Sequence, residues 1–148
     1  MTTSSTNDIR KKSSNILLKP HVGTKVNNII KSANTILYCK KWIETVEFYR
    51  CHLNLPVNFS TDWFVEFSLN AMSRLSIADE KHSSIKSCGG KGMTLAWEVE
   101  DIYTARQNII KAGAKPTEIR KHAWDASVFY FFDPEGHRIE FWESTKVL

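Results

Sequence analysis

The chain has few cysteines and no long apolar run, and both absences restrict what it can be. Its three cysteines, Cys39, Cys51 and Cys88, are an odd number, and no two have the Cys-x-x-Cys spacing. This usage argues against a disulfide framework and a zinc knuckle and favours free thiols in a reducing compartment. No apolar run approaches the roughly 20 residues that a spanning helix needs. We therefore expect a cytoplasmic protein with no membrane partner.

Excess positive charge is missing from most of the chain. The 148 residues have a formal net charge of +4. Residues 1–33 hold six Lys or Arg and one Asp, a balance of +5, which leaves −1 for residues 34–148. Nucleic-acid binding requires a basic patch or stripe on the folded part. We therefore expect no nucleic-acid partner.

Residues 1–33 differ in composition from the rest. They are rich in Ser, Thr, Asn and Lys, which predicts a flexible basic N-terminal tail. A Ser-rich basic stretch nearly free of acids is also typical of a transit peptide, so organellar targeting stays open. Residues 34–148 have the length and hydrophobic content of a single soluble domain.

The first half of this domain has the pattern of strands around one helix. Residues 34–39 read as a strand. Apolar residues then recur at spacings of 4, 3 and 4, which predicts an amphipathic helix; they are Trp42, Val46, Tyr49 and Leu53. Asn54 stands where a left-handed helix end is expected. Residues 63–69 have the alternation of a strand, and residues 74–78 read as another strand.

The same order then starts again. Residues 94–99 read as a strand, Asp101 is a good N-cap, and Gly113 ends the second helix. Asn34 matches Thr94 at an offset of 60. We therefore expect an α+β fold of two tandem βαβββ modules that form a curled mixed sheet around a cleft. Module one spans 34–80, a linker 81–92 and module two 93–144.

Residues 129–142 predict a hairpin of two strands. Its turn, residues 133–136, has the sequence Asp-Pro-Glu-Gly. We expect His137 in this turn to be solvated. Alternation after the turn places Glu140 on the face of its strand that lines the cleft. His122 and Trp124 precede the hairpin and are predicted to lie in a loop over the cleft.

The duplicated order resembles the vicinal oxygen chelate superfamily, which includes glyoxalase I, extradiol dioxygenases and bleomycin resistance proteins. Two motifs carry the resemblance, and together with the repeat they cover about residues 34–144. They are Tyr38-x(3)-Trp42-x(5)-Phe48-Tyr-Arg-x(2)-Leu53-x-Leu-Pro56 and Phe132-Asp-Pro-Glu-Gly136-x(2)-Ile-Glu140.

The resemblance also implies where a metal would bind. The ligand positions of metal-dependent members fall on Asn34, Ser76, Thr94 and Glu140. Only Glu140 is an ordinary ligand, and such metals require several carboxylate or imidazole donors. We therefore predict no tightly bound metal and no cofactor, which argues against glyoxalase and dioxygenase activity. A divalent metal held loosely at Glu140 stays an alternative.

Strand alternation predicts which side chains line the cleft. The candidate ligand-binding residues are Asn34, Tyr38, Phe64, Glu66, Ser76, Thr94, Glu98, Arg138 and Trp142, with Trp124 from the loop. Aromatic and acidic side chains favour a small aromatic or cationic ligand, as the resemblance to bleomycin resistance proteins implies.

Two other interpretations stay open. In one, Arg74 and Arg138 pair with the acidic side chains of the cleft, and the chain is a non-enzymatic structural or interaction module. In the other, Glu140 is the catalytic residue of a lyase, isomerase or dioxygenase, as a metal ligand or general base. The resemblance also implies a homodimer, and the cleft is then built within one chain or across two.

Overall fold

The computed structural model describes residue 23 and residues 26–146, in two compact units, Met1–Ile30 and Lys31–Leu148. In the first unit the structure describes a short 3-10 helix, η1 (Val26–Asn28). The predicted flexible tail and the transit-peptide alternative concern residues that lie mostly outside the described ones. The second unit contains the whole predicted domain.

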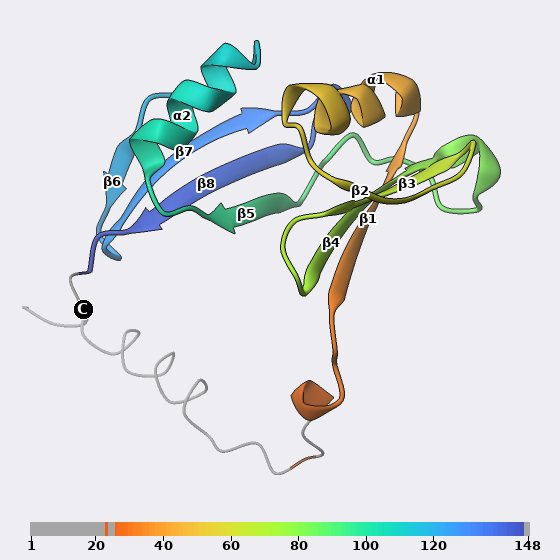
Figure 1. The fold of residues 1–148 in the computed structure, drawn as a ribbon, viewed down its shortest axis with the longest axis horizontal. Coiled ribbons are helices and arrows are strands. Elements are labelled where there is room, and N and C mark those ends of the chain that lie inside the picture. Colours follow the sequence, from red (N-terminus) through yellow and green to blue (C-terminus); the bar gives the residue numbers. More distant parts are fainter. Residues whose placement is uncertain (1–22, 24–25, 147–148) are drawn as a thin grey trace, which may run out of the picture. The chain divides into compact units, whose positions relative to one another are not determined.

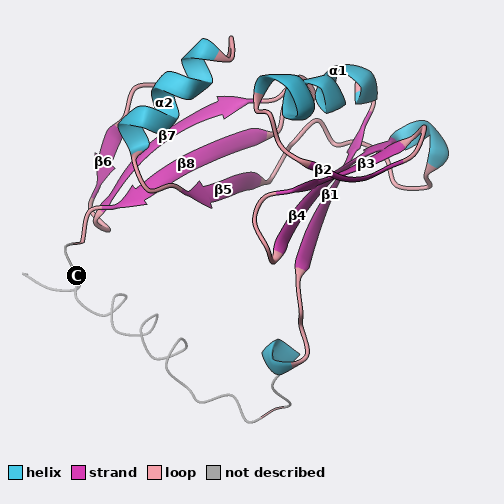
Figure 2. Ribbon diagram, viewed as in Figure 1, coloured by secondary structure: helices cyan, strands magenta, loops and turns pink. Residues whose placement is uncertain are grey.

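The second unit contains two four-stranded mixed sheets (Figures 1 and 2). The first has the order β1-β4-β3-β2, with β1 parallel to β4. The second has the equivalent order β5-β8-β7-β6, with β5 parallel to β8. The strands are β1 (Ala33–Cys39), β2 (Val57–Ser60), β3 (Phe64–Ser68), β4 (Ser73–Asp79), β5 (Thr94–Glu98), β6 (Arg120–His122), β7 (Ala126–Phe132) and β8 (Arg138–Ser144). This arrangement confirms the α+β fold class and the duplication.

One helix links the first two strands of each module. In module one, α1 (Trp42–Glu47) continues into the wider turns of η2 (Phe48–His52) and packs on β1 and β4. In module two, α2 (Ile102–Lys111) packs on β7 and β8. Asp101 caps α2 as predicted, since its side chain accepts from two backbone N–H groups. A third short helix, η3 (Glu80–His82), follows β4. No helix among the described residues is long and apolar enough to cross a membrane.

The hydrophobic core lies between the sheets and these helices. Side chains at alternate strand positions are buried there, and they include Leu37, Phe67, Leu75, Phe129 and Ile139. The strand faces predicted from alternation are therefore correct. Cys39 is fully buried in this core, as expected for a small core residue, and burial raises the pKa of its thiol.

The segment around His122 differs from the prediction. His122 ends β6, and it pairs with Ala126 of β7. Trp124 lies in the tight turn between them, where Asp125 has a φ of 59°. A three-residue edge strand is too short to show an alternating pattern. The prediction of a loop was therefore wrong for His122, although Trp124 does lie in a turn.

Candidate functional site

The helix-free face of the second sheet, here the module-two face, carries five of the predicted site residues, Thr94, Glu98, Arg138, Glu140 and Trp142. Strand register aligns its side chains in three rows. The rows are Thr94–Arg138–Phe132, Ala96–Glu140–Tyr130 and Glu98–Trp142–Val128. Glu140 therefore lies at the centre of the face, as the sequence predicts.

Arg138 neutralises Glu140 on this face. Its Nη2 lies 3.2 Å from Oε2 of Glu140. Its guanidinium carbon lies 3.9 Å from the ring centroid of Tyr130, in a cation–π contact. Its Nε is buried and has no hydrogen-bond partner among the described residues. The carboxylate of Glu140 is therefore compensated within the protein.

An aromatic pair lies beside this ion pair. The rings of Trp124 and Trp142 meet edge to face, with centroids 5.8 Å apart. His122 lies 5.8 Å from Trp124 on the other side. Trp124 is 54% exposed. Flat apolar surface is thus open to solvent at this edge of the module-two face.

The helix-free face of the first sheet, here the module-one face, carries a separate polar network. Ser76 Oγ donates to Asn34 Oδ1 at 2.9 Å, and Asn34 Nδ2 donates to Glu66 at 3.4 Å. Glu66 also accepts from Asn58, and Arg74 Nε lies 3.7 Å from its carboxylate. The negative charge of Glu66 on this face is therefore also neutralised within the protein.

The four positions that would hold a metal do not fit one. Asn34 and Ser76 use their oxygen atoms on each other, and Glu140 is paired with Arg138. Thr94 lies beside the cationic Arg138 in the strand register. Nowhere in the described part of the chain do three or more His, Cys, Asp or Glu side chains gather as a metal would require.

The structure brings the predicted residues together in two groups, one on each face. Tyr38 and Phe64 flank Ala78 at the end of the module-one face. The assignment of these residues to ligand binding stays a prediction. Glu98, which lies in the row of Trp142, also lines a cavity of about 690 Å³ between the modules, here the seam cavity. It is the only one of the predicted site residues in the lining.

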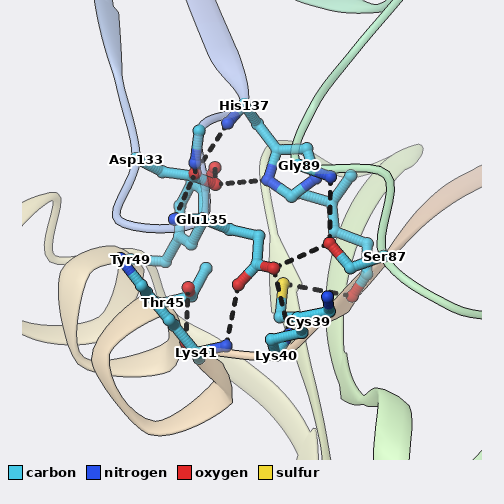
Figure 3. Close-up of polar contacts among 12 residues, drawn as sticks. Cys39, Lys40, Lys41, Thr45, Tyr49, Ser87, Gly89, Asp133, Glu135 and His137 are labelled. Carbon is cyan, nitrogen blue, oxygen red and sulfur yellow. Dashed lines mark hydrogen bonds and ion pairs between the residues drawn. The ribbon is translucent and has the colours of Figure 1, made fainter.

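A buried polar cluster joins the modules, and the sequence did not reveal it (Figure 3). Tyr49 of η2 donates its hydroxyl to Asp133 Oδ2 at 2.7 Å. His137 Nδ1 lies 2.8 Å from the same oxygen. Asp133 Oδ1 accepts from three backbone N–H groups of the turn. Burial and the neighbouring carboxylate raise the pKa of Tyr49.

His137 is only 3% exposed, so the prediction that it is solvated was wrong. The Asp-Pro-Glu-Gly turn does predict that Asp133 accepts backbone N–H groups. No sequence signal indicates Tyr49, which lies 84 residues away.

Glu135 caps α1 from the other module. Lys41, in the N-cap position, makes no side-chain cap bond. Instead, the carboxylate of Glu135 accepts from the backbone N–H groups of Lys40 at 3.0 Å and Lys41 at 2.8 Å, and from Ser87 Oγ at 2.7 Å (Figure 3). Partial burial opposes ionisation, but these hydrogen bonds outweigh it and lower the pKa of Glu135. The module-two turn therefore adds a carboxylate at the helix start, where Lys41 provides no side-chain cap.

Comparison with known proteins agrees with the duplicated architecture. The family model described as a glyoxalase-like domain matches residues 32–146. No curated protein matches this chain.

Solved structures with the same fold are similar to it at low identity. One is a glyoxalase/bleomycin resistance protein/dioxygenase from Nocardioides, 17% identical, with 93% of each chain covered and a TM-score of 0.66. A lactoylglutathione lyase from Agrobacterium tumefaciens is 16% identical, with 76% of this chain and 92% of that chain covered and a TM-score of 0.62. An antibiotic binding protein from a Streptomyces species is 12% identical, with 84% and 99% covered and a TM-score of 0.64. At these identities the likeness shows the fold alone.

Proposed function

We propose, since this chain belongs to the glyoxalase-like domain family, that it binds a small aromatic molecule on the module-two face without a tightly bound metal. The Trp124–Trp142 pair, in which Trp124 is 54% exposed and Trp142 half-buried, is the observation that carries this proposal. Aromatic side chains open to solvent beside a polar group are typical of ligand sites. One structural relative is an antibiotic binding protein, which supports binding as the function.

The charges on this face favour an aromatic ligand over a cationic one. Glu140 already pairs with Arg138, so a cationic ligand would have to displace an internal partner. A planar ligand stacks on Trp124 and Trp142 without breaking that pair.

Binding is tested with a panel of planar aromatic compounds, followed by calorimetry and tryptophan fluorescence. We expect Trp124→Ala to weaken a bound compound by about 1 kcal/mol, or about fivefold in Kd. Trp124 is more than half exposed, so its truncation leaves the fold intact. Trp63→Phe is the control, because Trp63 belongs to module one and stacks on His82 of η3. Absence of any binder, or equal loss in the control, would overturn the proposal.

The metal-free character is tested separately by elemental analysis after dialysis. The donors at Asn34, Ser76, Thr94 and Glu140 predict far less than one Ni, Zn, Fe or Mn per chain. One equivalent of metal that disappears in Glu140→Gln would contradict this part of the proposal.

A further inference from the structure

We propose that the seam cavity is a second binding site, specific for amphipathic amines, in which the ligand's ammonium group pairs with Glu98. The cavity lies between the modules and is separate from the Trp124–Trp142 pair, which does not line it. Although Glu98 pairs with Trp142 in the strand register, the two sites have different linings, so binding at one can be tested apart from binding at the other.

The walls of the seam cavity are largely apolar. Three leucines come from module one: Leu53 and Leu55, which follow η2, and Leu69, which follows β3. Trp97 and Phe141 come from module two, with ring centroids 5.8 Å apart. All five pack against the core and are only partly buried. A volume of about 690 Å³ lies in the range of small-molecule pockets, roughly 300–1,000 Å³. The unfilled apolar surface favours an apolar ligand body.

Glu98 supplies the charge. It is the only Asp, Glu, Lys or Arg among the residues that line the seam cavity. Its side chain takes part in no hydrogen bond or ion pair within the described ranges, whereas Glu66 and Glu140 each have an arginine partner. An available carboxylate at the edge of an apolar wall fits an ammonium group, which offers three donors.

The surroundings of Glu98 reinforce this preference. A neighbouring depression of about 360 Å³ shares Glu98 and Val99 with the cavity and adds Glu100 and Glu143. Glu143 is engaged, because it accepts from the backbone N–H of Ile102 at 2.9 Å. The depression has no basic side chain in its lining. The negative potential there attracts cations and disfavours carboxylate ligands.

Three probes of equal chain length separate charge from apolar burial. Octylamine, octanol and sodium octanoate are each titrated into the full chain at neutral pH by calorimetry. We expect saturable binding of octylamine, about fivefold weaker binding of octanol, and no measurable binding of octanoate. Glu98→Gln should reduce octylamine binding to the level of octanol. Glu100→Gln should retain most of the preference, since Glu100 does not line the cavity.

The position of the ligand is read from the indole N–H signals of the tryptophans by NMR. Octylamine should shift the signal of Trp97, which lines the cavity, and leave that of Trp124 in place. Equal binding of the three probes, or no effect of Glu98→Gln, would overturn the proposal. So would a shift of Trp124 alone, which would place the amine on the module-two face. A Trp97 signal that changes with protein concentration before ligand is added would assign the cavity to a second copy of the chain and also contradict it.

Discussion

At the scale of single residues, the carboxylate of Asp133 organises the module junction. One oxygen accepts three backbone N–H groups of its own turn, and the other accepts from Tyr49 and contacts His137. Asp133 is 5% exposed and Tyr49 is fully buried. A buried carboxylate is tolerated only when it is fully hydrogen-bonded, so each partner should contribute measurably to stability.

Tyr49→Phe tests this dependence. It removes the hydroxyl that donates to Asp133 at 2.7 Å and leaves a buried acceptor with one partner fewer. We expect a loss of about 1–3 kcal/mol in the free energy of unfolding, measured by urea denaturation. Tyr103→Phe is the control, because Tyr103 is 64% exposed. Equal stability of the two variants would contradict the assignment.

Glu135 should make stability depend on pH. Its pKa is lower in the folded protein than its usual value, so the stabilisation is present above the unfolded pKa of about 4.3 and is lost as pH falls through the folded pKa. Glu135→Gln should lower stability at neutral pH by about 0.5–1 kcal/mol and flatten the loss below about pH 4.3. Thermal unfolding between pH 3 and 7 measures both effects. Glu47→Gln, an exposed substitution on α1, should lose stability at acid pH as the wild-type protein does. A Glu135→Gln stability curve parallel to that of the wild type would refute the role of Glu135.

For single residues, the sequence predicted the strand face on which a side chain lies better than the residue with which it pairs. Alternation correctly placed Glu140 and Asn34 on the helix-free faces, because the period of a strand is local. The pairing of Arg138 with Glu140 was one of the alternatives, since both lie on the same face two residues apart. The bond from Tyr49 to Asp133 depends on how the modules pack, and no local pattern encodes that.

At the scale of elements, the linker crosses the β7–β8 turn at very close range. A Cβ on Gly90 would lie 2.4 Å from the carbonyl oxygen of Gly136. A Cβ on Gly136 would lie 2.8 Å from the carbonyl oxygen of Gly89. Both glycines also have positive φ. The linker and the turn therefore pack backbone against backbone, which only glycine permits.

Gly90→Ala and Gly92→Ala form a matched pair that tests this crossing. Both positions have positive φ, 79° and 76°, but a Cβ on Gly92 has no atom within 4 Å. We expect Gly92→Ala to cost about 1 kcal/mol from backbone strain alone. Gly90→Ala should cost clearly more, about 2 kcal/mol or above, because backbone atoms must also move. Chemical denaturation measures both, and equal losses would show that the crossing is loose.

The ends of helices and strands could be predicted from the sequence only where a local residue preference marks them. The helix caps at Asp101 and Asn54 were predicted, because capping and left-handed conformations have local residue preferences. The short edge strands β2 and β6 have four and three residues, too few for a readable period. For α1, the sequence shows an unfavourable Lys41 at the start, and its compensation by Glu135 comes from a distant turn.

At the scale of the whole molecule, the two modules keep one plan and differ in what their faces carry. Arg74 and Arg138 occupy equivalent strand positions at an offset of 64. Arg74 contacts Glu66, whereas Arg138 stacks on Tyr130, the residue equivalent to Glu66. The module-one face is thus a polar network and the module-two face an aromatic one. Duplication explains the shared frame, and substitution at matched positions explains why the proposed aromatic site belongs to one module.

The uncovered faces also bear on assembly, and we expect a homodimer in solution. Apolar side chains remain exposed on both helix-free faces, including Ile36, Phe59 and Phe132, the last at 56%. Exposed apolar surface of this kind is typical of an interface. Light scattering should give about twice the 17.0 kDa mass of the chain. Phe132→Lys should shift the mass toward a monomer, whereas Tyr103→Lys, an equally exposed change on the helix side, should not. A monomeric wild-type protein would refute the dimer, and a dimer unaffected by Phe132→Lys would place its interface elsewhere.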